Sequence, residues 1–197
     1  MDGGAQIGGR IGPNAITRVA EALPPDAVAA IFAEAGLAAH LRTPPAGMVD
    51  EREVAALHRV LRARLAPAAL AAVTRDAGLR TADYLLAHRI PRPVQWLLHA
   101  LPAPLAARVL CAAIARHAWT FVGRGSFRVL PGRPLRLVVT GCPLCRGAML
   151  DHPGCDYFAA TFERLFRRLV HRHARVTETA CEAMGDPACV FAVAYTT

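Results

Sequence analysis

The sequence contains no lysine, so all 23 of its basic side chains are arginines, and 15 acidic residues leave a formal net charge of +8. It has no uncharged apolar run of the roughly 18 residues that a membrane-spanning helix needs. Its N-terminus lacks the basic segment and apolar core of a signal peptide, so we expect a soluble, cytoplasmic protein. In that compartment the six cysteines are expected to be free thiols or metal ligands rather than disulfides.

Motifs for binding nucleic acids or redox cofactors are also missing. The arginines are scattered, without interleaved aromatic residues or zinc-finger spacing, so no nucleic-acid partner is expected. No strand–GxGxxG–helix unit, P-loop or ferredoxin-type run of cysteines is present. The excess of arginine reflects either the codon usage of a GC-rich genome or an acidic partner, such as a small molecule with carboxylates or an anionic lipid.

Apolar residues, among them many alanines, make up 54% of the chain. Alanine is the strongest helix former but a small core residue, so the composition favours helices. Apolar spacing, with proline and glycine between the segments, predicts a mainly helical part over residues 1–122. Within it, helices are expected over residues 13–23, 26–35, from 51 onward, 67–78, 81–88, 94–101 and 105–122.

Residues 123–197 have a different pattern, typical of strands around one helix. The turn signal Pro131-Gly132 lies between two β-rich runs, and an amphipathic helix is expected to begin at Asp156. The strands are expected at residues 126–130, 135–140, 174–180 and 189–195. We therefore predict one α+β domain over residues 1–197, in which a helix-rich body packs on a small antiparallel sheet and the tail has the order ββαββ.

The stretch E-T-A-C-E-A-M-G-D-P-A-C-V-F, residues 178–191, carries the first candidate metal ligands. Cys181 ends one predicted strand and Cys189 begins the next, so a hairpin would bring the two thiols together as half of a tetrahedral zinc site. Glu178 would face the other side of a regular strand, so it can join only at a bulge or a strand end. Cys155, directly before the predicted helix, is a further candidate because a helix N-terminus favours a thiolate.

A second ligand set is open on spacing alone. The segment C-P-L-C-R-G resembles a zinc knuckle, and its Cys142 and Cys145 could join Cys181 and Cys189 in a four-thiol site. Reduced thiols without any metal are the third alternative. The remaining cysteine, Cys111, lies among alanines in a predicted helix and is expected to be a small buried hydrophobic residue.

Three motifs together resemble the 4-vinyl reductase domain family. They are G-C-P-L-C-R-G at residues 141–147, P-G-C-D-Y-F-A-A-T-F-E-R-L-F at 153–166, and the stretch at 178–191. The opening R-I-G-P-N-A-I is similar to the bacteriochlorophyll-biosynthesis members of the family, so the resemblance covers nearly the whole chain. It implies a TRAPP-like fold of the type seen in ligand-binding domains of NO signalling and Golgi transport, often as a homodimer.

The resemblance also implies a metal site. In related phenol-sensing domains, a zinc ion is bound by a cysteine, a glutamate and two further cysteines. By type and position, this implies a structural Zn²⁺ with four ligands in this chain: Cys155, Glu178, Cys181 and Cys189. Cys142 and Cys145 then become secondary candidates.

The family's name suggests reduction of a vinyl group on divinyl chlorophyllide, but hydride delivery needs a redox cofactor for which no motif is present. We therefore expect a binding protein rather than an enzyme: a tetrapyrrole carrier or accessory protein in bacteriochlorophyll biosynthesis. A vinyl reductase and a sensor of small aromatic molecules are the alternatives. Other enzymes of bacteriochlorophyll synthesis, a second copy of the chain and a peripheral membrane contact stay open as partners.

A Mg-porphyrin or chlorophyllide-type pigment needs apolar walls, an axial ligand and a cation for its carboxylates. W-L-L-H-A-L and A-R-H-A-W-T-F supply these residue types. The pigment-binding candidates are Trp96, His99, Arg116, His117, Trp119 and Phe121. The alternative is that the aromatic residues belong to an ordinary core and that the histidines lie on the surface.

Overall fold

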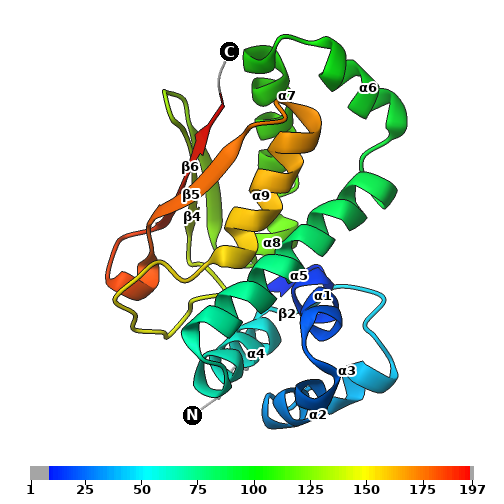
Figure 1. The fold of residues 1–197 in the computed structure, drawn as a ribbon, viewed down its shortest axis with the longest axis vertical. Helices are drawn as coiled ribbons and strands as arrows, with labels where there is room; N and C mark the ends of the chain where they lie inside the picture. Colours follow the sequence, from blue (N-terminus) through cyan, green and yellow to red (C-terminus); the bar gives the residue numbers. More distant parts are fainter. Residues whose placement is uncertain (1–8, 196–197) are drawn as a thin grey trace, which may run out of the picture.

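The structure, a computed structural model, describes residues 9–195 of the chain. It confirms the predicted α+β class, because helices pack on a small antiparallel sheet (Figure 1). The helices are α1 (Asn14–Ala22), α2 (Pro25–Glu34), α3 (Ala38–Arg42), α4 (Glu51–Arg64), α5 (Pro67–His88), α6 (Arg92–Ala100), α7 (Ala103–Arg116), α8 (Trp119–Val122) and α9 (Asp156–Leu169). The strands are β1 (Arg10–Ile11), β2 (Val49–Asp50), β3 (Ser126–Leu130), β4 (Leu135–Thr140), β5 (Arg175–Ala180) and β6 (Cys189–Ala194). None of the helices in this part of the chain is long and apolar enough to span a membrane.

The four-stranded sheet has the order β3-β4-β6-β5, with every neighbouring pair antiparallel. The predicted hairpin of β3 and β4 is confirmed, because alternating side chains and the Pro131-Gly132 turn specify it locally. The strand β6 lies between β4 and β5, and its first residue, Cys189, pairs with Val139 near the end of β4. The sheet therefore brings the beginning of β6 beside the loop that leaves β4.

Helix α9 lies between the sheet and the long helix α5 (Figure 1). Its apolar face includes Phe158 and Phe162, which pack against Phe191 of β6 with ring centroids 6.2 and 5.5 Å apart. Phe121 and Phe127 complete this aromatic cluster from α8 and β3. Edge-on packing of large rings is a stabilising arrangement, so this cluster fixes α9, and with it Cys155 at its start, relative to the sheet.

Helix α5 runs without a break, so the prediction of two helices divided at Gly78 is wrong. Gly78 is buried where α5 crosses α9, and a Cβ atom there would lie only 2.3 Å from the Tyr157 carbonyl oxygen. The Thr161 hydroxyl donates a hydrogen bond to the Gly78 carbonyl across the same contact, at 3.0 Å. The glycine permits a close approach of two helices and does not end one.

We expect Gly78→Ala to destabilise the protein by about 2 kcal/mol, because the added methyl group forces α5 and α9 apart. Urea unfolding of the purified chain measures this change. Gly47→Ala is the matched control, since a Cβ at Gly47 meets no atom within 4 Å. Equal stability of the two variants would contradict the close contact.

The helical part differs from the prediction at two further places. The helix expected over residues 105–122 is divided into α7 and α8 at His117 and Ala118. The short strands β1 and β2 were not predicted, because two residues carry no periodic signal. They bring the start of the chain to Asp50, which also caps α4 in a reciprocal pair with Glu53.

A buried carboxylate connects three parts of the fold. The side chain of Glu51, at the start of α4, is fully buried. It accepts hydrogen bonds from the backbone N–H of Arg124 at 2.9 Å and from Arg124 Nε at 3.0 Å. Arg146 Nη1, in the cysteine-rich loop after β4, donates to the same carboxylate at 2.8 Å. Glu51 therefore joins α4 to the turn after α8 and to that loop.

Candidate metal centre

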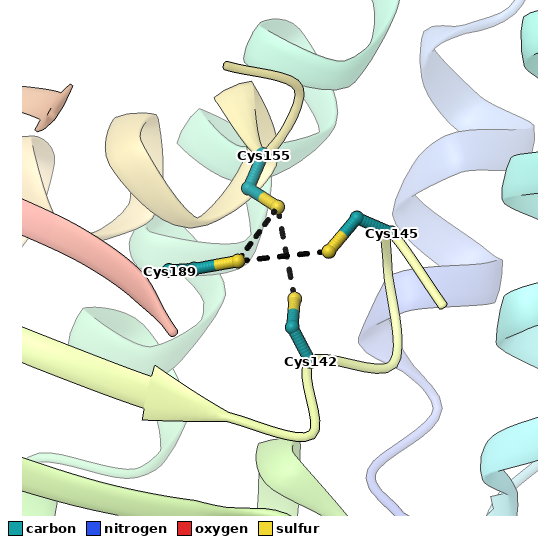
Figure 2. A group of neighbouring side chains, drawn as sticks. All are labelled: Cys142, Cys145, Cys155 and Cys189. Atoms are coloured by element: carbon teal, nitrogen blue, oxygen red, sulfur yellow. Dashed lines mark hydrogen bonds between the residues drawn. The ribbon is translucent and has the colours of Figure 1, made fainter. Parts of the chain in front are cut away.

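Five cysteines and one glutamate meet beneath the edge of the sheet. They come from four segments: the loop after β4, the start of α9, the end of β5 and the start of β6. The five thiols, Cys142, Cys145, Cys155, Cys181 and Cys189, are at most 2% exposed. Figure 2 shows four of them, with the sulfur atoms of Cys142, Cys145, Cys155 and Cys189 directed toward one another. The sequence predicted only part of this gathering.

The distances between the sulfur atoms fit metal binding. The Sγ atom of Cys155 lies 3.6 Å from that of Cys142 and 3.8 Å from that of Cys189. Cys189 Sγ lies 3.5 Å from Cys145 Sγ and 3.9 Å from Cys181 Sγ. Disulfide sulfurs would be about 2.0 Å apart, whereas two thiolates bound tetrahedrally at about 2.3 Å from one zinc ion lie about 3.8 Å apart. The buried cluster could therefore hold a metal ion.

Two overlapping ligand sets have all their donor atoms within 4.8 Å of one another. The first set is Cys142, Cys145, Cys155 and Cys189, and the second is Cys155, Glu178, Cys181 and Cys189. The second is the set that the family resemblance implied. The four-thiol set proposed from spacing is not one of the two, because Cys155 takes the place of Cys181 in it. Spacing could not reveal this, because the chain between Cys145 and Cys155 has no regular structure to extrapolate.

Glu178 reaches the cluster because β5 is irregular. The pairing with β6 shifts register between Glu178 and Ala180, which is the bulge that the sequence argument required. One carboxylate oxygen, Oε2, accepts a hydrogen bond from the Cys155 backbone N–H at 2.8 Å, while the other, Oε1, is buried without a hydrogen-bond partner. Burial raises the pKa of this carboxyl to about 8. An unpartnered buried oxygen beside thiols fits a metal ligand, because a metal ion would replace the missing partner.

The surroundings of the cluster offset negative charge and hold the loop in place. Hydrogen bonds from neighbouring thiols, first from Cys142, lower the pKa of Cys145 far below that of an ordinary thiol. The guanidinium of Arg62, which is partly buried near the thiols, donates to the Leu144 carbonyl at 2.8 Å. The Glu182 carboxylate accepts from the backbone N–H groups of Gly141 and Cys142 at 2.6 and 2.8 Å. The loop is thus shaped by side chains from α4 and from the β5–β6 turn.

The remaining cysteine behaves as expected. Cys111 is buried in α7, away from the cluster, and burial raises the pKa of its thiol to about 11. Its role is packing.

The six pigment-binding candidates do not meet at one place. Trp96 and His99 lie on α6, and His99 Nε2 is hydrogen-bonded to the Arg168 carbonyl. Arg116, His117 and Trp119 lie at the far end of α7, and Trp119 is 59% exposed. Fourteen residues of α7 span about 20 Å, so one flat ring cannot contact both groups.

Phe121 belongs to the aromatic cluster around α9 and serves the core. Two surface pockets lie elsewhere: one of about 290 Å³ beside Asp156 and Glu178, and one of about 210 Å³ between α1 and α3. Pigment binding near α6 or α8 stays a prediction.

The fold and the thiol-rich site define a class. Residues 135–194 match the model of the 4-vinyl reductase domain, and the chain belongs to this domain family. It is 48% identical over 195 residues to the bacteriochlorophyll synthase 23 kDa chain of Cereibacter sphaeroides, an alignment that covers 97% of this chain and 93% of the relative. It is 40% identical over 184 residues to the protein of the same name from Rhodobacter capsulatus, covering 92% and 85% of the two chains. The resemblance carried by the cysteine motifs is thereby confirmed.

Proposed function

We propose that the chain is a tetrapyrrole-binding carrier or accessory protein of bacteriochlorophyll biosynthesis with a structural zinc centre. The observation that carries the proposal is its similarity, over nearly its full length, to proteins named as chains of bacteriochlorophyll synthase. A carrier or accessory chain needs a pigment-binding surface and a stable scaffold, and no redox cofactor of its own.

The scaffold is the metal centre. In this proposal Cys155, Glu178, Cys181 and Cys189 bind a zinc ion, and all four positions of a tetrahedral ion are filled by the protein. Such an ion has no open position for a substrate and supplies stability by joining the start of α9 to the β5–β6 hairpin. Support comes from the sulfur distances and from the unpartnered Oε1 atom of Glu178.

The pigment would bind at the end of α7, where His117 is the axial ligand that the contacts favour. Its Nδ1 atom lies 2.9 Å from the Ala113 carbonyl oxygen. A carbonyl can only accept, so Nδ1 donates, and the neutral ring keeps its lone pair on Nε2. Histidine ligands usually have this arrangement, in which a hydrogen bond at one nitrogen orients the other toward the metal. The exposed Trp119 supplies an apolar face, and Arg116 a cation for a carboxylate.

His99 is the weaker candidate. Its Nε2 atom is already engaged with the Arg168 carbonyl, at the junction of α6 with the end of α9. Binding a magnesium ion through this atom would break that contact. His99 therefore makes a suitable matched control for His117, since both are exposed histidines near helix ends.

We expect the purified chain to shift the absorption spectrum of a divinyl Mg-porphyrin at micromolar concentrations. His117→Ala should weaken binding by at least about tenfold, the effect of losing about 1.4 kcal/mol, while His99→Ala should leave the affinity unchanged. Absorption titration of the three proteins measures this. An absent shift for the unmodified chain would refute pigment binding, and turnover of the divinyl pigment with NADPH or reduced ferredoxin would favour a reductase instead.

A further inference from the structure

The centre contains more metal ligands than one zinc ion can use. A tetrahedral ion takes four donors, whereas five buried thiols and one buried carboxylate meet here. With a single ion bound, two of the six would stay in the core without a metal. Burying polar donors without a partner costs free energy, so the surplus calls for a physical account.

The arrangement of the six donors supplies one. The two ligand sets share Cys155 and Cys189, whose sulfur atoms are 3.8 Å apart. On one side of this shared pair lie Cys142, 3.6 Å from Cys155, and Cys145, 3.5 Å from Cys189. On the other side lies Cys181, 3.9 Å from Cys189, together with Glu178. The donors thus outline two tetrahedra with one common edge.

We propose that the cluster binds two divalent, zinc-like ions, bridged by the thiolates of Cys155 and Cys189. One ion is completed by Cys142 and Cys145, and the other by Glu178 and Cys181. This inference rests on the structural zinc proposed above and adds a second ion to it. Thiolates bridge two zinc ions well because sulfur is polarizable and offers more than one lone pair.

Charge balance favours two ions over one. Five thiolates and one carboxylate carry six negative charges, which two divalent ions reduce to two, whereas one ion would leave four. The partly buried Arg62 lies near the thiols and offsets part of the remainder. The Glu182 backbone N–H donates to Cys189 Sγ at 3.4 Å, as expected for a sulfur that carries negative charge.

The chain topology gives each ion a separate structural role. The bridging residues lie at the starts of α9 and β6, two elements already fixed in the core. The first ion joins the loop after β4 to this pair, and the second joins the β5–β6 turn to it. Each flanking segment is therefore held by its own ion, and either ion can be removed through ligands that the other does not use.

Elemental analysis of the purified full-length chain tests the proposal. We expect two zinc ions per chain in the unmodified protein. The double variant Cys142→Ser/Cys145→Ser and the double variant Glu178→Gln/Cys181→Ser should each retain one. Cys111→Ala, which changes a buried thiol outside the cluster, should retain two. Cobalt(II) substitution gives a second readout, because ions bridged by thiolates are magnetically coupled and the EPR intensity per cobalt falls as the second site fills.

The outcomes separate this proposal from the structural zinc. One ion per unmodified chain overturns the second site and leaves a single zinc in place. No ion at all overturns both. Two ions with uncoupled cobalt spectra overturn the thiolate bridge. Because the main result comes from the unmodified protein, failure of a variant to fold does not prevent a decision.

Discussion

Cys189→Ser is expected to lose bound metal and to unfold far more easily than the unmodified chain. Cys189 belongs to both ligand sets, so no alternative set of four remains without it. At free metal about 1,000-fold above Kd, a bound ion stabilises the folded state by about 4 kcal/mol, and this is the expected loss. Thermal unfolding and elemental analysis of the same samples measure both effects. Treating the unmodified protein with a chelator should produce a similar loss of stability.

The control for this experiment is Cys111→Ala. It also removes a buried thiol, yet it should keep the metal and lose only the packing energy of one small side chain, about 1 kcal/mol. Cys155→Ser should behave as Cys189→Ser does, since it is the other shared ligand. Full metal content in Cys189→Ser would show that the cluster is a set of packed thiols without a metal-binding role.

Glu51→Gln is expected to destabilise the protein by about 3 kcal/mol at neutral pH. The substitution keeps the shape but removes the charge that faces Arg124 and Arg146, and breaking a buried ion pair typically costs this much. Burial alone would raise the pKa of Glu51, but hydrogen bonds from Arg146 and Arg124 outweigh it and lower the pKa to about 2.

The pH dependence of this variant follows from the lowered pKa. A carboxyl with a folded pKa of about 2 and an ordinary unfolded pKa of 4.5 stabilises the fold fully above pH 4.5. That contribution is lost as the pH falls from 4.5 through 2. The difference in unfolding free energy between the unmodified chain and Glu51→Gln should therefore shrink over this range. Urea unfolding at several pH values, with chelator in both samples, measures the difference, and a constant gap would contradict the ion pair.

The sequence predicted the elements whose signals are local. The β3–β4 hairpin and α9 were placed correctly because alternation, a Pro-Gly turn and a regular apolar face all agree within one segment. Gly78 was misinterpreted because its function depends on α9, a helix almost eighty residues later. The same limit applies to Glu51, which looks like an ordinary acidic residue in a first helical turn until Arg124 and Arg146 are placed beside it.

The metal centre was predictable only in part for the same reason. Cys181 and Cys189 are joined by one hairpin, so their meeting could be inferred from the chain between them. The bulge that admits Glu178 was recognised as a requirement, but no residue pattern indicates it. The contact of Cys142 with Cys155 depends on the path of an irregular loop, which the sequence does not specify.

Glu51 has a further consequence for how the two halves of the molecule communicate. Its carboxylate binds Arg146, next to Cys145, and Arg124, just after the helix that carries Trp119. One side chain thus connects the cysteine-rich loop to the neighbourhood of the histidine proposed to meet the pigment. Loosening the loop would free a guanidinium from this carboxylate and weaken the restraint on the turn after α8. Metal occupancy and readiness for pigment would then rise and fall together, through a link of two arginines and one glutamate.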